Sequence, residues 1–349
     1  MKINFKELNK EEYEAICNEA NVPLTQYFFY GEWQREVGKK VWRYGIEEAG
    51  NVVGFFQVIK YQTSFGKSYL YVPHGPVFLG EVSEELISEF KKFCNELLNK
   101  EDSIFLRLDP TWTLGVQVKE LSLGHRVSKF MYDGSFQPKY EWILDLLQSE
   151  EDILAGMKKV NRYSVRQAEK LGVEVEILDK DFSKYLDKFY ELIEATAVRD
   201  GFSHNMKDYY KKIFDQCEQN GNAFMEIARF NGQVMLVNFF VIYNNTAFFL
   251  FSGSENENRK IGYTYLAQWE AMNYAKRRRL KNYNFGAVIP EGNKYPFYDN
   301  WRGFSDFKKR FGGSMVEYSD YYDFIHNKFW YTLFALRRLL TLLQRKFGR

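Results

Sequence analysis

A run of aromatic and basic residues near the end of the chain has the chemistry of an anion or oxyanion site. Residues 304–313 alternate aromatic and basic side chains and end in two glycines. The alternation predicts a strand that runs into a tight turn, with Phe307 and Lys309 on one face and Lys308 and Arg310 on the other. A cation held beside a ring can stabilise an oxyanion or a phosphate. An edge strand protected from aggregation by its lysines explains the same pattern.

A second basic pattern lies in the middle of the chain. Lys158, Arg162, Arg166 and Lys170 follow one another at intervals of four, so on a helix they share one face. Such a stripe can follow the phosphates of a nucleic acid. A solvated helix face is the simpler interpretation, and the basic cluster at residues 277–281 is an equal candidate.

Two further segments have the composition of binding loops. Asp109-Pro110 directly follows the apolar residues 104–108, which places a carboxylate at the end of a predicted buried strand. It either faces a cleft or caps the next turn. Residues 259–264, Arg-Lys-Ile-Gly-Tyr-Thr, resemble in part the loop that holds the pyrophosphate of acetyl-CoA on helix-terminal amides, although Thr264 replaces its last small residue.

The elements that position these residues occur twice in the same order. In the first half, residues 40–46 and 52–59 predict a hairpin, 68–72 a third strand, 83–99 an amphipathic helix with Ser83 as its N-cap, and 104–108 a further strand.

In the second half, residues 151–171 predict one helix, and helices follow at 182–199 and 207–220. A hairpin turns at Asn231-Gly232, and a strand, a helix at 261–280 and a last strand complete the series. A meander, a helix and another strand, found twice, resemble a duplicated GNAT-type N-acyltransferase unit.

Composition and charge restrict the function. The chain has 349 residues, which is enough for two domains of ordinary size or one large one. With 45% hydrophobic and 27% charged residues, its composition is that of a globular protein. Its formal net charge is +2, so RNA binding requires a local patch. Three cysteines without a pairing pattern predict free thiols in a reducing compartment, and four scattered histidines predict no metal site.

The two ends of the chain bear on its location. The first residues contain no apolar segment of the signal-peptide type, and no run approaches the roughly 20 apolar residues of a spanning helix. We therefore expect a cytoplasmic protein. Residues 325–349 predict a helix with a wide apolar surface and a basic face. This helix docks on the body of the protein, lies on an anionic membrane such as the inner face of the plasma membrane, or contacts a partner protein.

Six segments in order resemble the Fem family (FemABX) of peptidoglycan interpeptide-bridge aminoacyltransferases. They cover nearly the whole chain, and they are residues 30–34, 73–77, 106–110, 162–173, 250–254 and 307–313. The resemblance implies an α/β (α+β) fold of two tandem GNAT-like domains. The expected boundaries are 1–147, completed by 320–349, and 148–319. No coiled-coil arm is present in the sequence, as in the short members of the family.

The resemblance also implies a reaction. An amino acid (Ala, Gly or Ser) would pass from aminoacyl-tRNA to the stem-peptide side-chain amine of a peptidoglycan precursor. The acceptor would be lipid II or UDP-MurNAc-pentapeptide, and no cofactor is expected. Two alternatives stay open: a GNAT-fold N-acyltransferase that uses an acyl-CoA donor, and a catalytically silent module that binds envelope precursors.

Individual roles follow from the resemblance alone. Lys308, preceded by Phe307, matches the position that stabilises the ester carbonyl as it becomes an oxyanion, and Asp109 matches a proposed general base. Tyr209 matches a residue that contacts the nucleotide sugar. The substrate-binding candidates are Arg35, Ser203, Asn205, Tyr209 and Phe251, and the tRNA or phosphate candidates are Lys158, Arg162, Arg166 and Arg310.

Three of these positions depart from the family pattern. Asn205 replaces an arginine, Phe251 replaces a tyrosine, and Arg35 is only the nearest cation to a phosphate-binding lysine. These differences favour a lipid-linked acceptor or a changed substrate.

Overall fold

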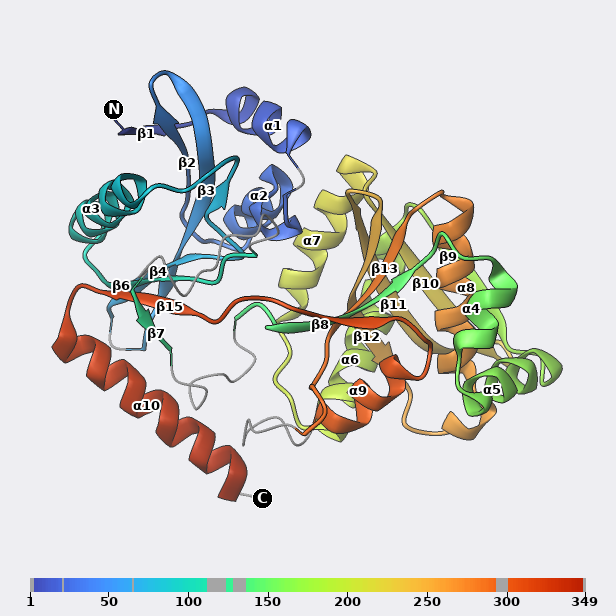
Figure 1. Cartoon of the computed structure of the whole chain (residues 1–349). Helices are drawn as coiled ribbons and strands as arrows, with labels where there is room; N and C mark the ends of the chain where they lie inside the picture. Colours follow the sequence, from blue (N-terminus) through green and yellow to red (C-terminus); the bar gives the residue numbers. More distant parts are fainter. Residues whose placement is uncertain are drawn as a thin grey trace. The chain divides into compact units, whose positions relative to one another are not determined.

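The chain divides into two compact units (Figure 1). The computed structural model describes residues 3–20, 22–64, 66–111, 124–127, 136–292 and 301–347. Unit 1 comprises Met1–Lys139 and Glu317–Arg349, and unit 2 comprises Tyr140–Asn293 and Tyr298–Val316. The division falls before residues 140–147, which were expected in the first domain, because strand β8 pairs with a strand of unit 2.

Unit 1 is built around a mixed sheet whose described strands have the order β1-β2-β3-β4-β6-β15-β7, with β5 paired to β3. Its strands are β1 (Ile3–Glu7), β2 (Val41–Glu48), β3 (Asn51–Gln62), β4 (Ser68–Val72), β5 (Val77–Phe78), β6 (Ser103–Leu108), β7 (His125–Arg126) and β15 (Tyr322–Ile325). Its helices are α1 (Lys10–Glu19), η1 (Leu24–Gln26), α2 (Phe28–Glu36), α3 (Glu84–Lys100) and α10 (Lys328–Phe347).

The core of unit 1 forms where α3 covers the sheet. Ser83 caps the helix by accepting a hydrogen bond from the Leu86 amide, as its position before the apolar repeat predicts. Phe90 of α3 lies edge-on to Phe56 of β3, with ring centroids 5.3 Å apart. The C-terminal strand β15 pairs with β6, so the end of the chain returns to this sheet.

The described part of unit 2 also contains a seven-stranded path, in which β9 to β12 correspond to β1 to β4 of unit 1 and β13 corresponds to β6. The sheet order of its described strands is β14-β8-β13-β12-β11-β10-β9. The strands are β8 (Tyr140–Asp145), β9 (Glu174–Leu178), β10 (Ala223–Phe230), β11 (Gln233–Tyr243), β12 (Thr246–Ser254), β13 (Asn282–Ala287) and β14 (Ser314–Glu317). The helices are α4 (Glu150–Gly156), α5 (Lys159–Lys170), η4 (Phe182–Tyr185), α6 (Leu186–Asp200), α7 (Lys207–Asn220), η5 (Arg259–Ile261), α8 (Tyr263–Arg277) and α9 (Arg302–Lys309).

The repeated order predicted from the sequence is confirmed. In unit 1 a meander ends in β4, α3 follows, and β6 pairs parallel to β4; in unit 2 a meander ends in β12, α8 follows, and β13 pairs parallel to β12. The turn between β10 and β11 has positive φ angles at Asn231 and Gly232, as an Asn-Gly hairpin requires.

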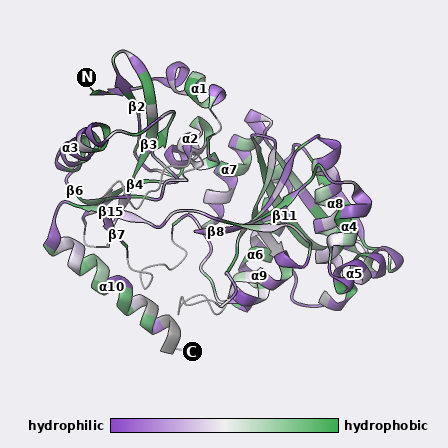
Figure 2. Ribbon diagram, in the orientation of Figure 1, coloured by the Kyte–Doolittle hydropathy of each residue, from purple (hydrophilic) through white to green (hydrophobic). Residues whose placement is uncertain are grey.

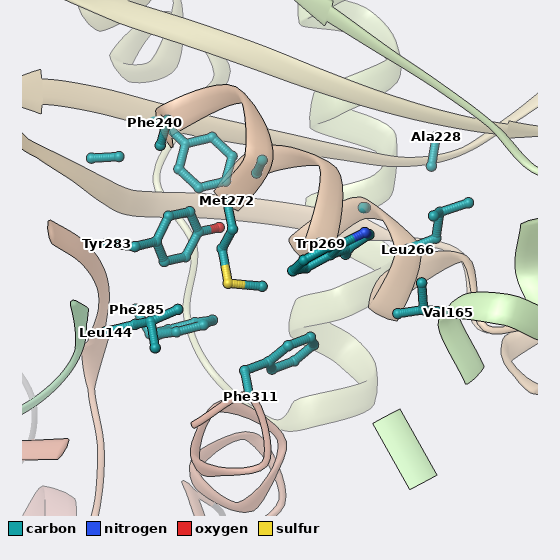
Figure 3. Close-up of a cluster of buried hydrophobic side chains, with 14 of the residues drawn as sticks. Leu144, Val165, Ala228, Phe240, Leu266, Trp269, Met272, Tyr283, Phe285 and Phe311 are labelled. Atoms are coloured by element: carbon teal, nitrogen blue, oxygen red, sulfur yellow. The ribbon is translucent and has the colours of Figure 1, made fainter. Parts of the chain in front are cut away.

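The core of unit 2 lies between its sheet and α8 (Figure 3). Phe240, Tyr283 and Phe285 of the sheet face Met272 and Trp269 of α8. Val165 of α5 and Phe311, which follows α9, join the same cluster. The apolar colouring of the strands contrasts with the hydrophilic outer helices such as α5 (Figure 2).

In two places the elements differ from those expected, apart from the segment at residues 304–313 described below. Residues 151–171 form two helices, because Lys158 is extended (ψ 146°) and its amide donates to the Arg310 carbonyl at 2.9 Å, a contact distant in sequence. Strand β1 was not expected, and it pairs with β2 from the short segment Ile3–Glu7 before α1.

Two further expectations concern the cysteines and membrane-spanning helices. Cys17, Cys94 and Cys217 are free and buried, as their spacing predicts. Within the described ranges, no helix has the length and apolar character needed to cross a membrane.

Candidate functional site

Residues 304–309 of the aromatic and basic segment lie in helix α9, so the prediction of a strand is wrong. Phe304, Phe307 and Phe311 recur at helical spacing, and Phe307 and Phe311 pack on each other with centroids 5.1 Å apart. A segment this short fits both the two-residue period of a strand and the 3.6-residue period of a helix. The packing of Phe307 on Tyr265 and of Phe311 on Phe285 favours the helix.

The predicted turn after this segment is confirmed. Gly312 and Gly313 have φ angles of +87° and +93°. A side chain at Gly313 would place its Cβ 2.5 Å from the Ile143 carbonyl oxygen, so only glycine fits there.

The parallel strands β12 and β13 separate beside α9. They pair only from Thr246 with Asn282 to Phe248 with Asn284, although both strands continue beyond. Gly286 lies in the separating part with a φ of +74°. A Cβ built on it would lie 3.7 Å from the Phe249 carbonyl oxygen and 3.8 Å from Lys308 Nζ. The Lys308 amine therefore lies at the opening between the two strands.

Lys308 is held in this opening by a carbonyl and a ring. Its Nζ donates to the Ala287 carbonyl at 2.8 Å and lies 4.9 Å from the Phe304 ring centroid. Burial lowers the pKa of Lys308 from its usual value to about 7, and the charge of Glu141 partly opposes this change. An amine with this pKa can act at neutral pH either as a cation or as a proton acceptor.

The ring beside the Lys308 amine belongs to Phe304 rather than to Phe307. Phe307 instead packs on Tyr265 and Phe311, with centroids 5.2 and 5.1 Å away. The role of Phe307 visible in the structure is to fix α9 on the core, which positions Lys308.

Sequence reasoning missed the buried carboxylate of this site. Glu141 of β8 is buried, and its Oε2 accepts a hydrogen bond of 2.7 Å from Asn284 Nδ2. The signal was a charged residue inside an otherwise apolar strand. Its negative charge favours the protonated form of Lys308.

Asp109 lies in unit 1, where its buried carboxylate is bound by polar groups. The carboxylate is 2% exposed and accepts from Tyr71 Oη and from the His74 amide, both at 2.6 Å. Burial raises the pKa of Asp109 to about 8 even though both hydrogen bonds favour its charged form. The Gln137 amide donates to Tyr71 Oη at 3.1 Å and extends the network.

His74 continues this network at a special backbone position. Its φ angle is +54°, which is uncommon for a residue with a side chain, and the Asp109 contact holds it there. Burial lowers the pKa of the His74 imidazole to about 3, so the ring is neutral. Asp109 thus holds the turn after β4.

The substrate-binding candidates fall into two groups. Asn205, Tyr209 and Phe251 lie together in unit 2: the Asn205 amide donates to Tyr210 Oη at 3.2 Å, and Phe251 lies 6.4 Å from Tyr209 and 5.2 Å from Tyr210 by ring centroids.

Ser203 is exposed in the same turn between α6 and α7. Arg35 lies in unit 1, where its guanidinium donates to Glu32 Oε1 at 3.0 Å and to the Val41 carbonyl at 2.8 Å.

The tRNA or phosphate candidates differ in whether their side chains are exposed or already bound to backbone carbonyls. Arg162 donates to the carbonyls of Leu154, Ala155 and Met157, so it caps the end of α4. Lys158 and Arg166 are exposed, and the Lys158 amide joins α5 to Arg310. The predicted stripe of four equivalent cations is therefore wrong, because Lys158 precedes the helix and Arg162 is already bound.

The loop at residues 259–264 forms η5 and the start of α8, as expected. Gly262 has a φ of +89°, and a Cβ there would lie 2.6 Å from the Ser164 carbonyl oxygen. Glycine at this position therefore allows α8 to approach α5 closely.

Comparison with solved structures defines the class of fold. A structure titled FemX has 19% sequence identity and a TM-score of 0.76, and the match covers 95% of this chain and 99% of that one. A tandem GNAT protein from the clavulanic acid biosynthesis pathway has 14% identity and a TM-score of 0.60, with 93% and 99% covered. The chain has the tandem GNAT-like fold that its repeated order predicts.

The sequence comparison then gives the family. Residues 8–239 and 231–338 match the model of the FemAB family, and the chain belongs to that family. The lipid II:glycine glycyltransferase of Staphylococcus haemolyticus (strain JCSC1435) is 26% identical over 230 residues, 62% of this chain and 53% of that protein. The Staphylococcus aureus protein of the same name is 25% identical over 223 residues, 62% of this chain and 52% of that protein. The matched region spans about half the length of these relatives.

Proposed function

We propose that this protein transfers an amino acid (Ala, Gly or Ser) from aminoacyl-tRNA to the stem-peptide side-chain amine of a peptidoglycan precursor. Membership of the FemAB family supports the reaction class, and relatives named lipid II:glycine glycyltransferase support the acceptor. The observation that carries the proposal is the Lys308 amine in the opening between β12 and β13.

The chemistry of Lys308 follows from aminolysis of an ester. The acceptor amine attacks the ester carbonyl carbon, the C–N bond forms, and negative charge develops on the carbonyl oxygen. The C–O bond to the tRNA ribose then breaks, and the ribose hydroxyl leaves with a proton that balances the one lost by the amine. A Lys308 ammonium uses one N–H to donate a hydrogen bond to the Ala287 carbonyl and keeps two N–H groups for the oxyanion.

Asp109 is the predicted general base, but its contacts support a structural role. Both carboxylate oxygens already accept hydrogen bonds that hold Tyr71 and the His74 turn. We infer that Asp109 acts mainly by fixing this turn. The proton of the acceptor amine would then pass to the leaving ribose oxygen or to a substrate phosphate.

We propose a lipid-linked acceptor and a peripheral contact of residues 325–349 with the membrane. On α10, Tyr331 and Phe334 pack on Phe105 with centroids 5.2 and 5.0 Å away. The apolar residues Phe329, Leu336, Leu340 and Leu343 are exposed, and their spacing places them in one stripe. Lys328 and Arg337 are exposed cations of the same helix, which suits an anionic lipid surface.

Vesicle binding tests this contact. Co-sedimentation with anionic vesicles, lost with Leu340→Glu and absent with neutral vesicles, is the expected result. Equal sedimentation of the wild type and the Leu340→Glu variant would contradict it. A Phe334→Glu variant cannot serve as the control, because Phe334 is a buried docking residue.

One observation favours a second candidate function. The glycine-containing start of α8 and the tandem GNAT fold are compatible with an acyl-CoA donor. Transfer of label from a pool of charged tRNAs to UDP-linked and lipid-linked precursor, assayed in parallel, separates the two. Label that is lost after RNase treatment of the donor supports the proposal. No transfer to either acceptor, together with saturable acetyl-CoA binding, would favour the second function.

A further inference from the structure

Helix α5 presents a basic row with an aromatic ring on the side opposite its buried residues. Lys159, Tyr163, Arg166 and Lys170 are all exposed, and their spacing of four, three and four places them on one face. The buried residues of α5 are Asn161, Val165 and Ala168, half a turn away. We call these four exposed residues the α5 row.

The cations of the α5 row are available to a ligand. In the described part of the chain, Lys159, Arg166 and Lys170 make no ion pair with a carboxylate. Glu169 is the one carboxylate in α5, and helical spacing places it on the flank of the row. Tyr163 is 64% exposed, so its ring is accessible to a partner.

The α5 row begins where the helix with Lys308 ends. The Lys158 amide donates to the Arg310 carbonyl at 2.9 Å, and Arg310 is the residue that ends α9. A Cβ on Gly312 would lie 3.4 Å from the Gly156 carbonyl oxygen, so the two segments are in contact. The 12 residues of α5 extend about 18 Å from this junction.

We propose that the α5 row is the surface that binds the acceptor arm of the tRNA donor. This inference rests on the proposed function, which places the aminoacylated end of the RNA at Lys308. From there the chain of phosphates would pass Arg310 and follow α5. Lys159 meets a phosphate where the RNA reaches α5, and Tyr163, one turn into the helix, stacks on a base of the unpaired end. Arg166 and Lys170 meet phosphates of the stem. A protein with a net charge of only +2 needs such a local patch.

Salt-dependent binding tests the charges. The variant combines Lys159→Gln, Arg166→Gln and Lys170→Gln, and the probe is fluorescein-labelled bulk tRNA followed by anisotropy. Three lost phosphate contacts reduce the slope of log Kd against log salt by about 3 and weaken binding at least about tenfold. The matched comparison is Arg277→Gln with Arg279→Gln and Lys281→Gln, the other exposed basic cluster of unit 2. A loss confined to this second triple variant would overturn the proposal.

The ring is tested separately from the charges. Tyr163→Ala removes the stacking surface and weakens tRNA binding about five- to tenfold without changing the salt slope. Tyr163→Phe keeps the ring and binds like the wild type. Equal binding by the Ala and Phe variants would contradict the stacking role.

Transfer assays separate failure of the surface from failure of the proposed function. With charged tRNA as donor, the α5 triple variant raises KM and leaves kcat within about twofold. If the wild type transfers label from charged tRNA and the triple variant shows the same KM, the α5 surface is wrong and the function stands. If the wild type binds tRNA through α5 but transfers nothing from it, the function is wrong and the surface stands.

Discussion

The two units contain the same parallel strand pair, closed in one and open in the other. In unit 1, β4 and β6 pair to their last residues, Val72 and Leu108, and Asp109 then ties β6 to the turn after β4. In unit 2, β12 and β13 pair only as far as Phe248 and Asn284, and Lys308 lies where they separate.

This difference bears on which of the two strand pairs can bind a ligand. A closed strand pair satisfies its own backbone groups and leaves little for a ligand to bind, whereas an opened pair exposes carbonyls and amides and admits a side chain. We propose that the duplicated fold places the chemistry in unit 2, beside Lys308, and that the polar residues at the corresponding edge of unit 1 hold structure.

The largest expected effect comes from the buried ion pair that fixes β15 to β6 in unit 1. Arg107 Nε and Nη2 donate to the two oxygens of Asp323 at 2.7 Å, and both side chains are fully buried. Asp323→Asn leaves a buried guanidinium without its counterion and lowers the free energy of unfolding by about 3–5 kcal/mol. Denaturant unfolding measures this loss.

A neighbouring surface pair provides the control for that measurement. Arg126 of β7 pairs with Asp320, but its side chain is largely exposed. Arg126→Ala lowers the free energy of unfolding by less than about 1 kcal/mol. Equal losses for the two variants would show that the closed sheet of unit 1 does not depend on its buried ion pair.

The next effect concerns the open pair in unit 2. Lys308→Ala removes the proposed oxyanion donor and costs about 2–4 kcal/mol of transition-state stabilisation, seen as a lower kcat in single-turnover transfer. Lys309→Ala is the matched control, because Lys309 also donates to a carbonyl, that of Ile289, from the same helix. A loss confined to acceptor affinity would contradict the role of Lys308.

Asp109→Asn tests whether the closed end of unit 1 is structural. The amide group that replaces one carboxylate oxygen cannot accept from both Tyr71 and His74 as the carboxylate does, and stability falls by about 1–3 kcal/mol. Thermal unfolding and single-turnover transfer are measured on the same preparation. Unchanged stability with a loss of transfer of about a hundredfold or more would restore Asp109 as the general base.

The smallest expected effect is a change in the pKa of Lys308. Glu141→Gln removes the negative charge that favours the Lys308 ammonium, so the pKa of Lys308 falls further. The decline of transfer with rising pH then begins at a lower pH than in the wild type. A shift to higher pH, or none, would show that Glu141 does not act on Lys308.

Local sequence signals predicted much of the scaffold. The β2–β3 hairpin, the Asn231-Gly232 turn and the Ser83 cap follow from short-range chemistry, and the structure confirms all three. The family assignment rested on six short segments in order, which together outweigh the ambiguity of each one. Lys308 was found in this way, although as part of a strand that is in fact α9.

Long-range contacts explain what the sequence could not predict. Arg162 was assigned to a phosphate stripe because the local sequence does not show that it binds the carbonyls of α4. That binding requires the break between α4 and α5 at Lys158, and the break in turn depends on the contact of Lys158 with Arg310. Glu141 was passed over because its pairing with Asn284 joins residues far apart in the chain. In both cases only packing showed which side chains were already bound.

The most direct test of the account is the pH dependence of the ratio of single-turnover rates, wild type over Lys308→Ala, with charged tRNA as donor. The ratio cancels the ionisation of the acceptor amine, which both proteins share. Burial places the pKa of Lys308 at about 7, below its usual value, so the ammonium is lost as the pH rises through this point. If the Lys308 ammonium stabilises the oxyanion, the ratio is constant below about pH 7 and falls above it. A ratio that rises through pH 7 would show that the neutral amine acts as a base, and a flat ratio would show that the charge of Lys308 has no part in the reaction.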